Sequence, residues 1–248
     1  LYSMSQTMAV RGPDDEGYLT YNNDGKMISY FGETTPRKLI EGDRRLKHVK
    51  SGFQEASILA LGHRRLSILD LTINAHQPMI DSSRRYSIVF NGEIYNFKQV
   101  REILCQKGCK FHSESDTEVI LLAYRQWKER CLEKFNGDFA FAIWDNQKKY
   151  LFCARDRIGV KPFYYVLDDK KFIFGSDIKT VLSSSLIEAQ PDESGLYLSM
   201  AFGIAPRPIT AFKNIRALEQ SHWMRIYSNG SCERGRYWSI PINSQDHK

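Results

Sequence analysis

The sequence predicts an α+β fold in which two groups of antiparallel strands pack as layers, with helices between and around them. One observation is a hairpin near the start, where strand-like segments at 18–21 and 26–31 flank Asn-Asn-Asp-Gly. A second is the run of short, aromatic-rich segments that begins at residue 137, with turn residues between them. A third is helical spacing of apolar side chains at 96–107 and again after Ser115.

The remaining elements follow from local patterns in chain order. Residues 1–10 are expected to end a helix, and 11–17 are expected to form an acidic loop, because Gly-Pro interrupts a helix. Within the stretch 58–71, Leu66 and Ile68 are expected on one strand face and Arg65 on the other. Further strands are predicted at 86–90, 138–144, 149–155, 162–167, 171–175 and 222–227, and short helices at 177–184 and 192–202.

Length and composition are typical of a globular protein with a substantial core. The chain has 248 residues, of which 42% are apolar and 26% charged, enough for one large domain or two small ones. The formal charge of +6 is concentrated only at 37–50. That run lacks interleaved aromatic residues and contains two acids, so a solvated insertion loop is favoured over a nucleic-acid site.

Cysteine usage and the absence of long apolar runs indicate the compartment. The five cysteines are scattered, with no Cys-x-x-Cys pair and no metal-type spacing with histidine, so neither disulfides nor a metal are expected. No stretch is apolar for long enough to span a membrane, and the first residues lack the features of a signal peptide. A cytoplasmic protein that contacts no membrane is therefore expected.

Asn91 and Gly92 directly follow the predicted strand at 86–90. Asn-Gly is the commonest two-residue hairpin loop, and a hairpin turn is one interpretation of this pair. The other is an oxyanion site, because an amide side chain beside a bare backbone N–H provides two donors. On these residues alone both interpretations stand, with the hairpin favoured.

Two charged residues have a similar double interpretation. Arg65 at the edge of an apolar strand is either a surface residue whose stem covers the core or a bidentate grip for a carboxylate. Asp116 lies in the capping-box pattern Ser115-Asp116-Thr117-Glu118, where it either favours the helix dipole or holds an ammonium group. An amino-acid ligand needs both a cation and an anion, which Arg65 and Asp116 could supply.

Beyond these residues, the sequence resembles the glutaminase domain of asparagine synthetases, the class II (N-terminal-nucleophile) glutamine amidotransferases. The resemblance rests on an ordered set of motifs that spans nearly the whole chain. These are Arg11-Gly12-Pro13-Asp14, residues 62–68, Gln77-Pro78-Met79, residues 91–96, 115–120, 135–145, 155–165 and 174–179.

The resemblance implies a four-layer αββα sandwich of two antiparallel sheets, with its N-terminal strand absent from this chain. It implies hydrolysis of glutamine to glutamate and ammonia, which a tunnel carries to a synthetase domain. There ATP, with Mg, activates aspartate for conversion to asparagine. No cofactor and no metal are expected in the glutaminase domain, its own C-terminal synthetase domain is the expected partner, and a homodimer is a further expectation.

The resemblance also assigns roles to individual residues. Arg65 would bind the α-carboxylate of glutamine and Asp116 its α-ammonium group. Asn91 and Gly92 would form the oxyanion hole, and Glu93 would line the same pocket. Backbone groups around Leu66 and Ile68 would complete the pocket.

Two departures from the family pattern concern the ends of the chain. The family nucleophile is a cysteine at the mature N-terminus, whereas residue 1 is leucine and the nearest thiol, Cys105, lies in a predicted helix. The cysteine is expected to precede Leu1, so the chain alone is expected to be inactive. The synthetase phosphate loop also does not occur, so 1–237 is interpreted as the glutaminase domain and 238–248 as the start of a linker.

Alternatives remain at the level of function. One is a glutamine-binding pseudoenzyme module that has no nucleophile. Another is an amidotransferase that acts on a sugar or on a different carboxylate. A basic α+β domain of unrelated role is disfavoured by the ordered motifs. The ammonia acceptor, the upstream cysteine, the oligomeric state and the role of 37–50 are not determined by the sequence.

Overall fold

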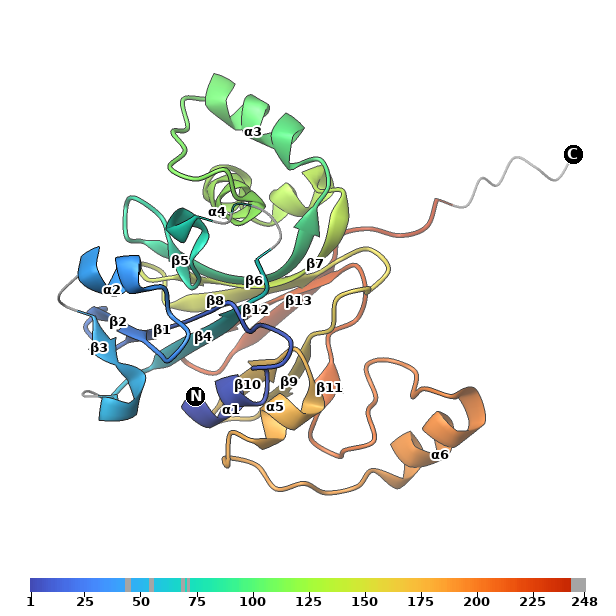
Figure 1. The fold of residues 1–248 in the computed structure, drawn as a ribbon. Helices are drawn as coiled ribbons and strands as arrows, with labels where there is room; N and C mark the ends of the chain where they lie inside the picture. Colours follow the sequence, from blue (N-terminus) through green and yellow to red (C-terminus); the bar gives the residue numbers. More distant parts are fainter. Residues whose placement is uncertain (43–45, 54–55, 68–69, 71, 242–248) are drawn as a thin grey trace, which may run out of the picture.

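The structure is a computed structural model that describes residues 1–42, 46–53, 56–67, 70 and 72–241. Its described strands form three sheets, and helices lie on the outer faces of those sheets, apart from one helix at 193–202 that lies outside the layers (Figure 1). The predicted α+β class is therefore confirmed. Within the described residues, every helix is too short or too polar to cross a membrane.

The largest sheet has six strands, in the order β13-β12-β8-β7-β6-β5. All of its pairings are antiparallel, as predicted for the aromatic-rich segments. Its strands are β5 (Met79–Ile80), β6 (Tyr86–Ile94), β7 (Gly137–Asp145), β8 (Tyr150–Arg155), β12 (His222–Tyr227) and β13 (Cys232–Arg236).

Two smaller sheets lie on one face of the large sheet. One has the order β3-β2-β1-β4 and the other β10-β9-β11. Their strands are β1 (Asp15–Tyr21), β2 (Met27–Phe31), β3 (Lys47–His48), β4 (Leu59–Arg65), β9 (Tyr164–Leu167), β10 (Phe172–Gly175) and β11 (Arg216–Ala217).

Helices complete the outer layers. In Figure 1, α3 and α4 cover the free face of the six-stranded sheet, and α1 and α5 lie below the smaller sheets. The helices are α1 (Tyr2–Gln6), α2 (Arg37–Gly42), α3 (Phe97–Gln106), α4 (Asp116–Trp127), α5 (Ile178–Leu182) and α6 (Glu193–Phe202), with 3₁₀ turns η1 (Val49–Ser51), η2 (Ile73–Ala75) and η3 (Lys128–Lys134).

Strand alternation divides the core between the two faces of the large sheet. In β7, Phe141 and Ile143 pack toward α4, whereas Ala142 and Trp144 pack toward the smaller sheets. Successive side chains of a strand point to opposite faces, so a continuous apolar run fills both sides. The four layers are thus helix, sheet, sheet and helix, as expected for an αββα sandwich.

Two local expectations are wrong near the N-terminus. The segment predicted as an acidic loop enters β1 at Asp15, and Glu16 is buried there with a 3.0 Å ion pair to Arg64. Residues 37–50 form more than a solvated loop, because the described part contains α2 and β3, which pairs in parallel with β2. Arg44 and Arg45 of that run lie outside the described residues.

Candidate functional site

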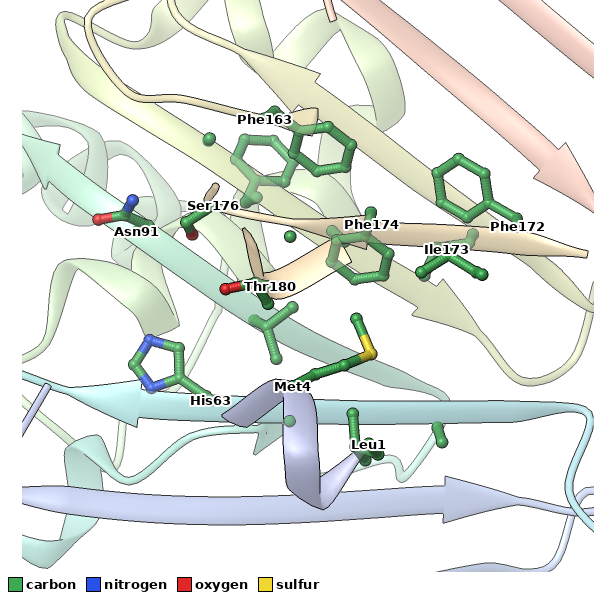
Figure 2. Close-up of a pocket in the computed structure, with 18 of the residues that line it drawn as sticks. Leu1, Met4, His63, Asn91, Phe163, Phe172, Ile173, Phe174, Ser176 and Thr180 are labelled. Atoms are coloured by element: carbon green, nitrogen blue, oxygen red, sulfur yellow. The ribbon is translucent and has the colours of Figure 1, made fainter. Parts of the chain in front are cut away.

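A cavity of about 1430 Å³ opens between the edge of β4 and the edge of β10. These are end strands of the two smaller sheets, so the cavity occupies the break between them. Figure 2 shows His63 and Asn91 toward one end of the cavity and the aromatic side chains of β10 toward the other.

Six of the seven predicted site residues line this cavity. The seventh, Ile68, lies outside the described residues. The six come from the end of β4 and the residue after it, from β6, and from the start of α4. They are Arg65, Leu66, Asn91, Gly92, Glu93 and Asp116.

Asn91 and Gly92 do not form a hairpin turn, so the local interpretation of this pair is wrong. β6 continues through both residues to Ile94, and they pair with Ala140 and Phe139 of β7. Nine consecutive pairs join β6 to β7, and this long ladder overrides the turn preference of Asn-Gly. The pair is therefore presented by a rigid strand.

On the edge of β6 that faces away from β7, side chains form hydrogen bonds with the backbone groups of Phe90 and Ile94. The Phe90 N–H donates to Gln77 Oε1 at 2.7 Å, and the Phe90 carbonyl accepts from His63 Nε2 at 3.0 Å. Four residues further along, the Ile94 N–H donates to Asp116 Oδ2 at 3.0 Å. These contacts take the place of a neighbouring strand, because β5 pairs with β6 only at Ile88 and Ser87.

Alternation along β6 places the Gly92 N–H on this same edge. In an antiparallel strand the N–H groups of residues two apart point to the same side, so Gly92 follows Phe90 and Ile94. Phe139, opposite Gly92, directs its own N–H and carbonyl to Asp156 instead of to β6. The Gly92 N–H is thus turned toward the cavity that Gly92 lines.

Position 92 requires glycine. Its φ of +146° is rarely adopted by residues with a side chain. A Cβ atom there would also collide with the carbonyl oxygen of Asp138, because the β7 backbone passes very close. Close packing against β7 therefore requires glycine at position 92. Because glycine has no side chain, its N–H is also left accessible from the cavity.

His63 is a neutral imidazole in this setting. Burial lowers the pKa of His63 from 6.5 to about 4. Because the Phe90 carbonyl can only accept, Nε2 must carry the proton. His63 Nδ1 is then an acceptor; it is buried and has no hydrogen-bond partner within the described residues. The sequence motif contained His63 and Gln77, but nothing in it indicated that both hold Phe90.

Arg65 is buried, not a surface residue, since only 9% of it is exposed. It ends β4, and its guanidinium donates to the carbonyl oxygens of Asp70 and, at 3.4 Å, Thr72. Leu66, the first residue after β4, is 56% exposed. The predicted strand thus stops at Arg65, before Leu66, and both residues line the cavity.

The Arg-Gly-Pro-Asp loop fixes the residues that follow β4. Asp14 Oδ2 accepts from the Ser67 N–H at 2.7 Å, and the Asp14 N–H donates to the Arg65 carbonyl at 3.0 Å. Gly12 lies so close to the Arg64 backbone that a Cβ atom would collide with it. This loop positions Arg65, a role that the sequence motif alone did not assign.

Asp116 combines both of its interpretations. It lies in the first turn of α4, where a carboxylate is favoured, and it also lines the cavity. Burial raises the pKa of the Asp116 carboxyl, and the nearby charge of Glu93 raises it further. An ammonium group placed beside Asp116 would relieve both effects.

The predicted capping box is only half formed. Ser115 Oγ accepts from the Thr117 N–H at 3.1 Å, as expected of an N-cap. Glu118, however, does not return to Ser115; its carboxylate accepts from the N–H groups of His112 and Ser113. Glu118 therefore organises the loop before α4, which a four-residue pattern cannot reveal.

None of the five cysteines lines the cavity, and all five fall within the described residues. Cys105 lies in α3, as predicted, and its side chain is exposed. Burial raises the pKa of the Cys131 and Cys153 thiols, so neither is activated as a nucleophile. The described residues of the cavity thus provide charges and hydrogen-bond donors, and not a thiol.

Residues 43–238 match the glutamine amidotransferase domain family. Asparagine synthetase 3 (glutamine-hydrolysing) of Bacillus subtilis is 41% identical over 184 residues, which are 72% of this chain and 29% of that protein. Putative asparagine synthetase 2 (glutamine-hydrolysing) of Methanocaldococcus jannaschii is 34% identical over 96% of this chain and 43% of that protein. The chain therefore spans less than half the length of these relatives.

A solved structure supports the fold. The glutamine phosphoribosylpyrophosphate amidotransferase of B. subtilis, determined with ADP and GMP, aligns with a TM-score of 0.63 at 18% identity. The alignment covers 98% of this chain and 47% of that one. The similarity concerns the fold alone, and it confirms the predicted sandwich.

Proposed function

Because this chain belongs to the family of glutamine amidotransferase domains, we propose that its cavity binds glutamine and places the side-chain amide at Asn91 and Gly92. The observation that carries the proposal is the placing of opposite charges, Arg65 and Asp116, on the walls of one cavity. An α-amino acid carries a carboxylate and an ammonium group, so its binding site needs one cationic and one anionic side chain. The chain is then the glutaminase half of an asparagine synthetase-like enzyme.

Each residue has a chemical task in this proposal. Arg65 pairs with the α-carboxylate of glutamine, and Asp116 pairs with the α-ammonium group. Attack on the side-chain amide carbon produces a tetrahedral oxyanion, which the Asn91 side-chain N–H and the Gly92 N–H stabilise. Such donors act on charge that develops during the reaction and typically contribute about 10²–10³-fold in rate. Glu93 and Leu66 complete the pocket wall.

The nucleophile is proposed to enter the cavity on a separate extended segment. The break between β4 and β10 has strand edges on both sides, and an added strand could pair with either. A cysteine on such a strand, with its α-amine as base, would face the proposed oxyanion donors. This arrangement would distinguish an enzyme from a binding module without a nucleophile.

The test of the nucleophile uses the polypeptide made from the complete gene. We expect it to release glutamate from glutamine and to lose this activity when the cysteine of a Met-Cys-Gly start is changed to alanine. Glutamate release from a polypeptide that has no such cysteine would contradict the proposed nucleophile. Glutamine binding without any release would identify the pseudoenzyme alternative.

The whole protein's reaction is proposed from its relatives. Ammonia would pass to a synthetase domain, where ATP with Mg activates aspartate and asparagine is formed. That domain is proposed to be part of the same cytoplasmic protein. An acceptor that is a sugar or another carboxylate is the alternative, and measurement of which acceptor is amidated decides between them.

Calorimetric titration with matched ligands and variants tests the two grips. Glutaramic acid lacks the α-ammonium group of glutamine, and 4-aminobutanamide lacks the α-carboxylate. We expect Asp116→Asn to weaken glutamine at least about tenfold while leaving glutaramic acid unaffected, since a lost charge pair affects only ligands that carry the partner. Arg65→Gln should show the converse pattern with 4-aminobutanamide.

The control variants remove one charge of the same sign from a residue outside the cavity. Glu114→Gln and Arg101→Gln remove a surface ion pair near α4, and neither residue lines the cavity. Both should leave glutamine affinity within about twofold of the wild type. Equal losses for glutamine and for its truncated analogues in Asp116→Asn and Arg65→Gln would refute the assigned grips.

A further inference from the structure

Helix α6 presents an unusually apolar surface to solvent. Tyr197, Met200 and Phe202 are 72%, 87% and 69% exposed, and Ile204 just after the helix is 63% exposed. Figure 1 shows α6 on a long excursion outside the four layers. Between residues 193 and 206 the only charged side chain is Glu193. A solvated helix normally has a charged outer face, so this surface calls for a partner.

Contacts at Asp192 and Gly195 fix the start of the helix in this position. Asp192 Oδ1 accepts from the Gly195 N–H at 2.8 Å, which caps the start of α6. Gly195 packs so closely on the Thr210 carbonyl that no Cβ atom would fit. The Asp192 N–H also donates to the Ala211 carbonyl at 2.9 Å. The apolar side chains are therefore presented outward by a fixed base.

The apolar surface continues toward the glutamine cavity. Arg207, which follows α6, donates to the Gly159 carbonyl at 3.0 Å. Gly159 lies between Ile158 and Val160, which are 69% and 48% exposed. The next residues of the same loop, at 161–162, line the cavity. One short loop thus joins the exposed apolar surface to the cavity wall.

We infer that α6 and the 158–160 loop together form the docking surface for the domain that receives ammonia. The inference rests on the proposed function, in which ammonia must leave the cavity without escaping to water. An apolar contact that begins at the cavity wall would exclude water from that path. The relatives also extend well beyond the matched part, with more than half of their length outside it.

Photo-crosslinking in the protein made from the complete gene identifies the occupant. A benzophenone side chain replaces Tyr197 or Met200 on α6. In the control it replaces Ile103, which is 41% exposed on α3, a helix that Figure 1 shows on the other side of the sheets from α6. We expect crosslinks from 197 and 200 to peptides of the ATP-dependent, amide-forming domain, and none from 103. Crosslinks from 197 and 200 to a second copy of residues 1–248 would overturn the inference. So would a crosslinking yield at 197 and 200 that is no higher than the yield at 103.

A second measurement follows the consequence for ammonia. Met200→Asp places a charge in the contact, so we expect the ratio of glutamate formed to amide formed to rise at least about threefold. Calorimetric glutamine affinity should stay unchanged, because Met200 lies outside the cavity. Normal glutamine binding with an unchanged ratio would refute the docking surface alone, whereas absence of glutamine binding in the wild type would refute the proposed function.

Discussion

Position 92 has no room for a side chain, because the Asp138 carbonyl of β7 occupies the place of a Cβ atom. Its φ of +146° adds backbone strain for any other residue. We therefore expect Gly92→Ala to lower the free energy of unfolding by at least about 3 kcal/mol. Urea denaturation followed by tryptophan fluorescence measures this change.

Gly108→Ala separates the two causes. Gly108 also has positive φ, +82°, but nothing lies within 4 Å of a Cβ atom placed there. This variant should lose only about 1 kcal/mol. Similar losses at positions 92 and 108 would mean that the close approach of β7 contributes nothing.

His63 makes folding stability depend on pH. Its pKa is about 4 in the folded protein and 6.5 for an unperturbed imidazole, so the unfolded chain binds more protons between these values. The free energy of unfolding should therefore fall as the pH is lowered from about 6.5 toward 4, and the decrease due to His63 should reach up to about 3 kcal/mol. Denaturation midpoints measured from pH 7 to 4 give this slope.

His63→Gln keeps a donor for the Phe90 carbonyl but cannot titrate. The difference between the wild-type and His63→Gln curves cancels the titration of other groups, including Asp116. This difference in stability should vary with pH between about 6.5 and 4. Parallel wild-type and His63→Gln curves would show that His63 is not held neutral.

At the scale of elements, the loop before α4 depends on one carboxylate of that helix. Glu118 accepts from the His112 N–H at 2.9 Å, and from the Ser113 N–H and Oγ at 2.7 Å each. Glu118→Gln replaces one acceptor with a donor, so we expect a loss of about 1–3 kcal/mol in unfolding free energy. Thermal or urea denaturation at pH 7 measures it.

Glu114→Gln is the matched control for this element. The Glu114 side chain is 82% exposed, and its carboxylate forms a surface ion pair with Arg101 at 3.0 Å. Loss of this exposed pair should cost no more than about 0.5 kcal/mol. If the two variants lose equal stability, the loop is not organised by Glu118.

At the scale of the whole molecule, the layers and the α6 excursion should open separately. β6, β7 and β8 are buried between layers, whereas α6 buries only Gly195. Local opening requires little free energy where few apolar groups are buried. Hydrogen–deuterium exchange read by mass spectrometry should therefore find residues 193–206 exchanging much faster than the central strands.

The same measurement on the protein from the complete gene connects to the docking surface. Slower exchange of 193–206 there than in residues 1–248 alone is the expected result. Protection of 193–206 equal to that of β7 in residues 1–248 alone would contradict independent opening of α6. The α6 excursion would then belong to the sandwich core.

Several features were determined by the sequence itself. Periodicity placed β2, α3, α4, β8, β12 and α6 within a few residues, because these elements have strong two-residue or 3.6-residue patterns or clear caps. The short edge strands β3 and β13 were not predicted, because their patterns are weak and their pairing is non-local. The ordered motifs predicted the family and the six cavity residues, although the roles of those residues stay predictions.

Only the tertiary structure decided the conformation, the burial and the contacts of those residues. Asn91-Gly92 has the local chemistry of a turn, but nine pairs with β7 hold it in a strand. Arg65 resembles a surface residue, but only 9% of it is exposed in the fold. His63, Gln77 and Asp116 are far apart in the chain and meet at one edge of β6. Local preference is a weak term of about 1 kcal/mol per residue, whereas packing and pairing between distant segments sum over many contacts and therefore prevail.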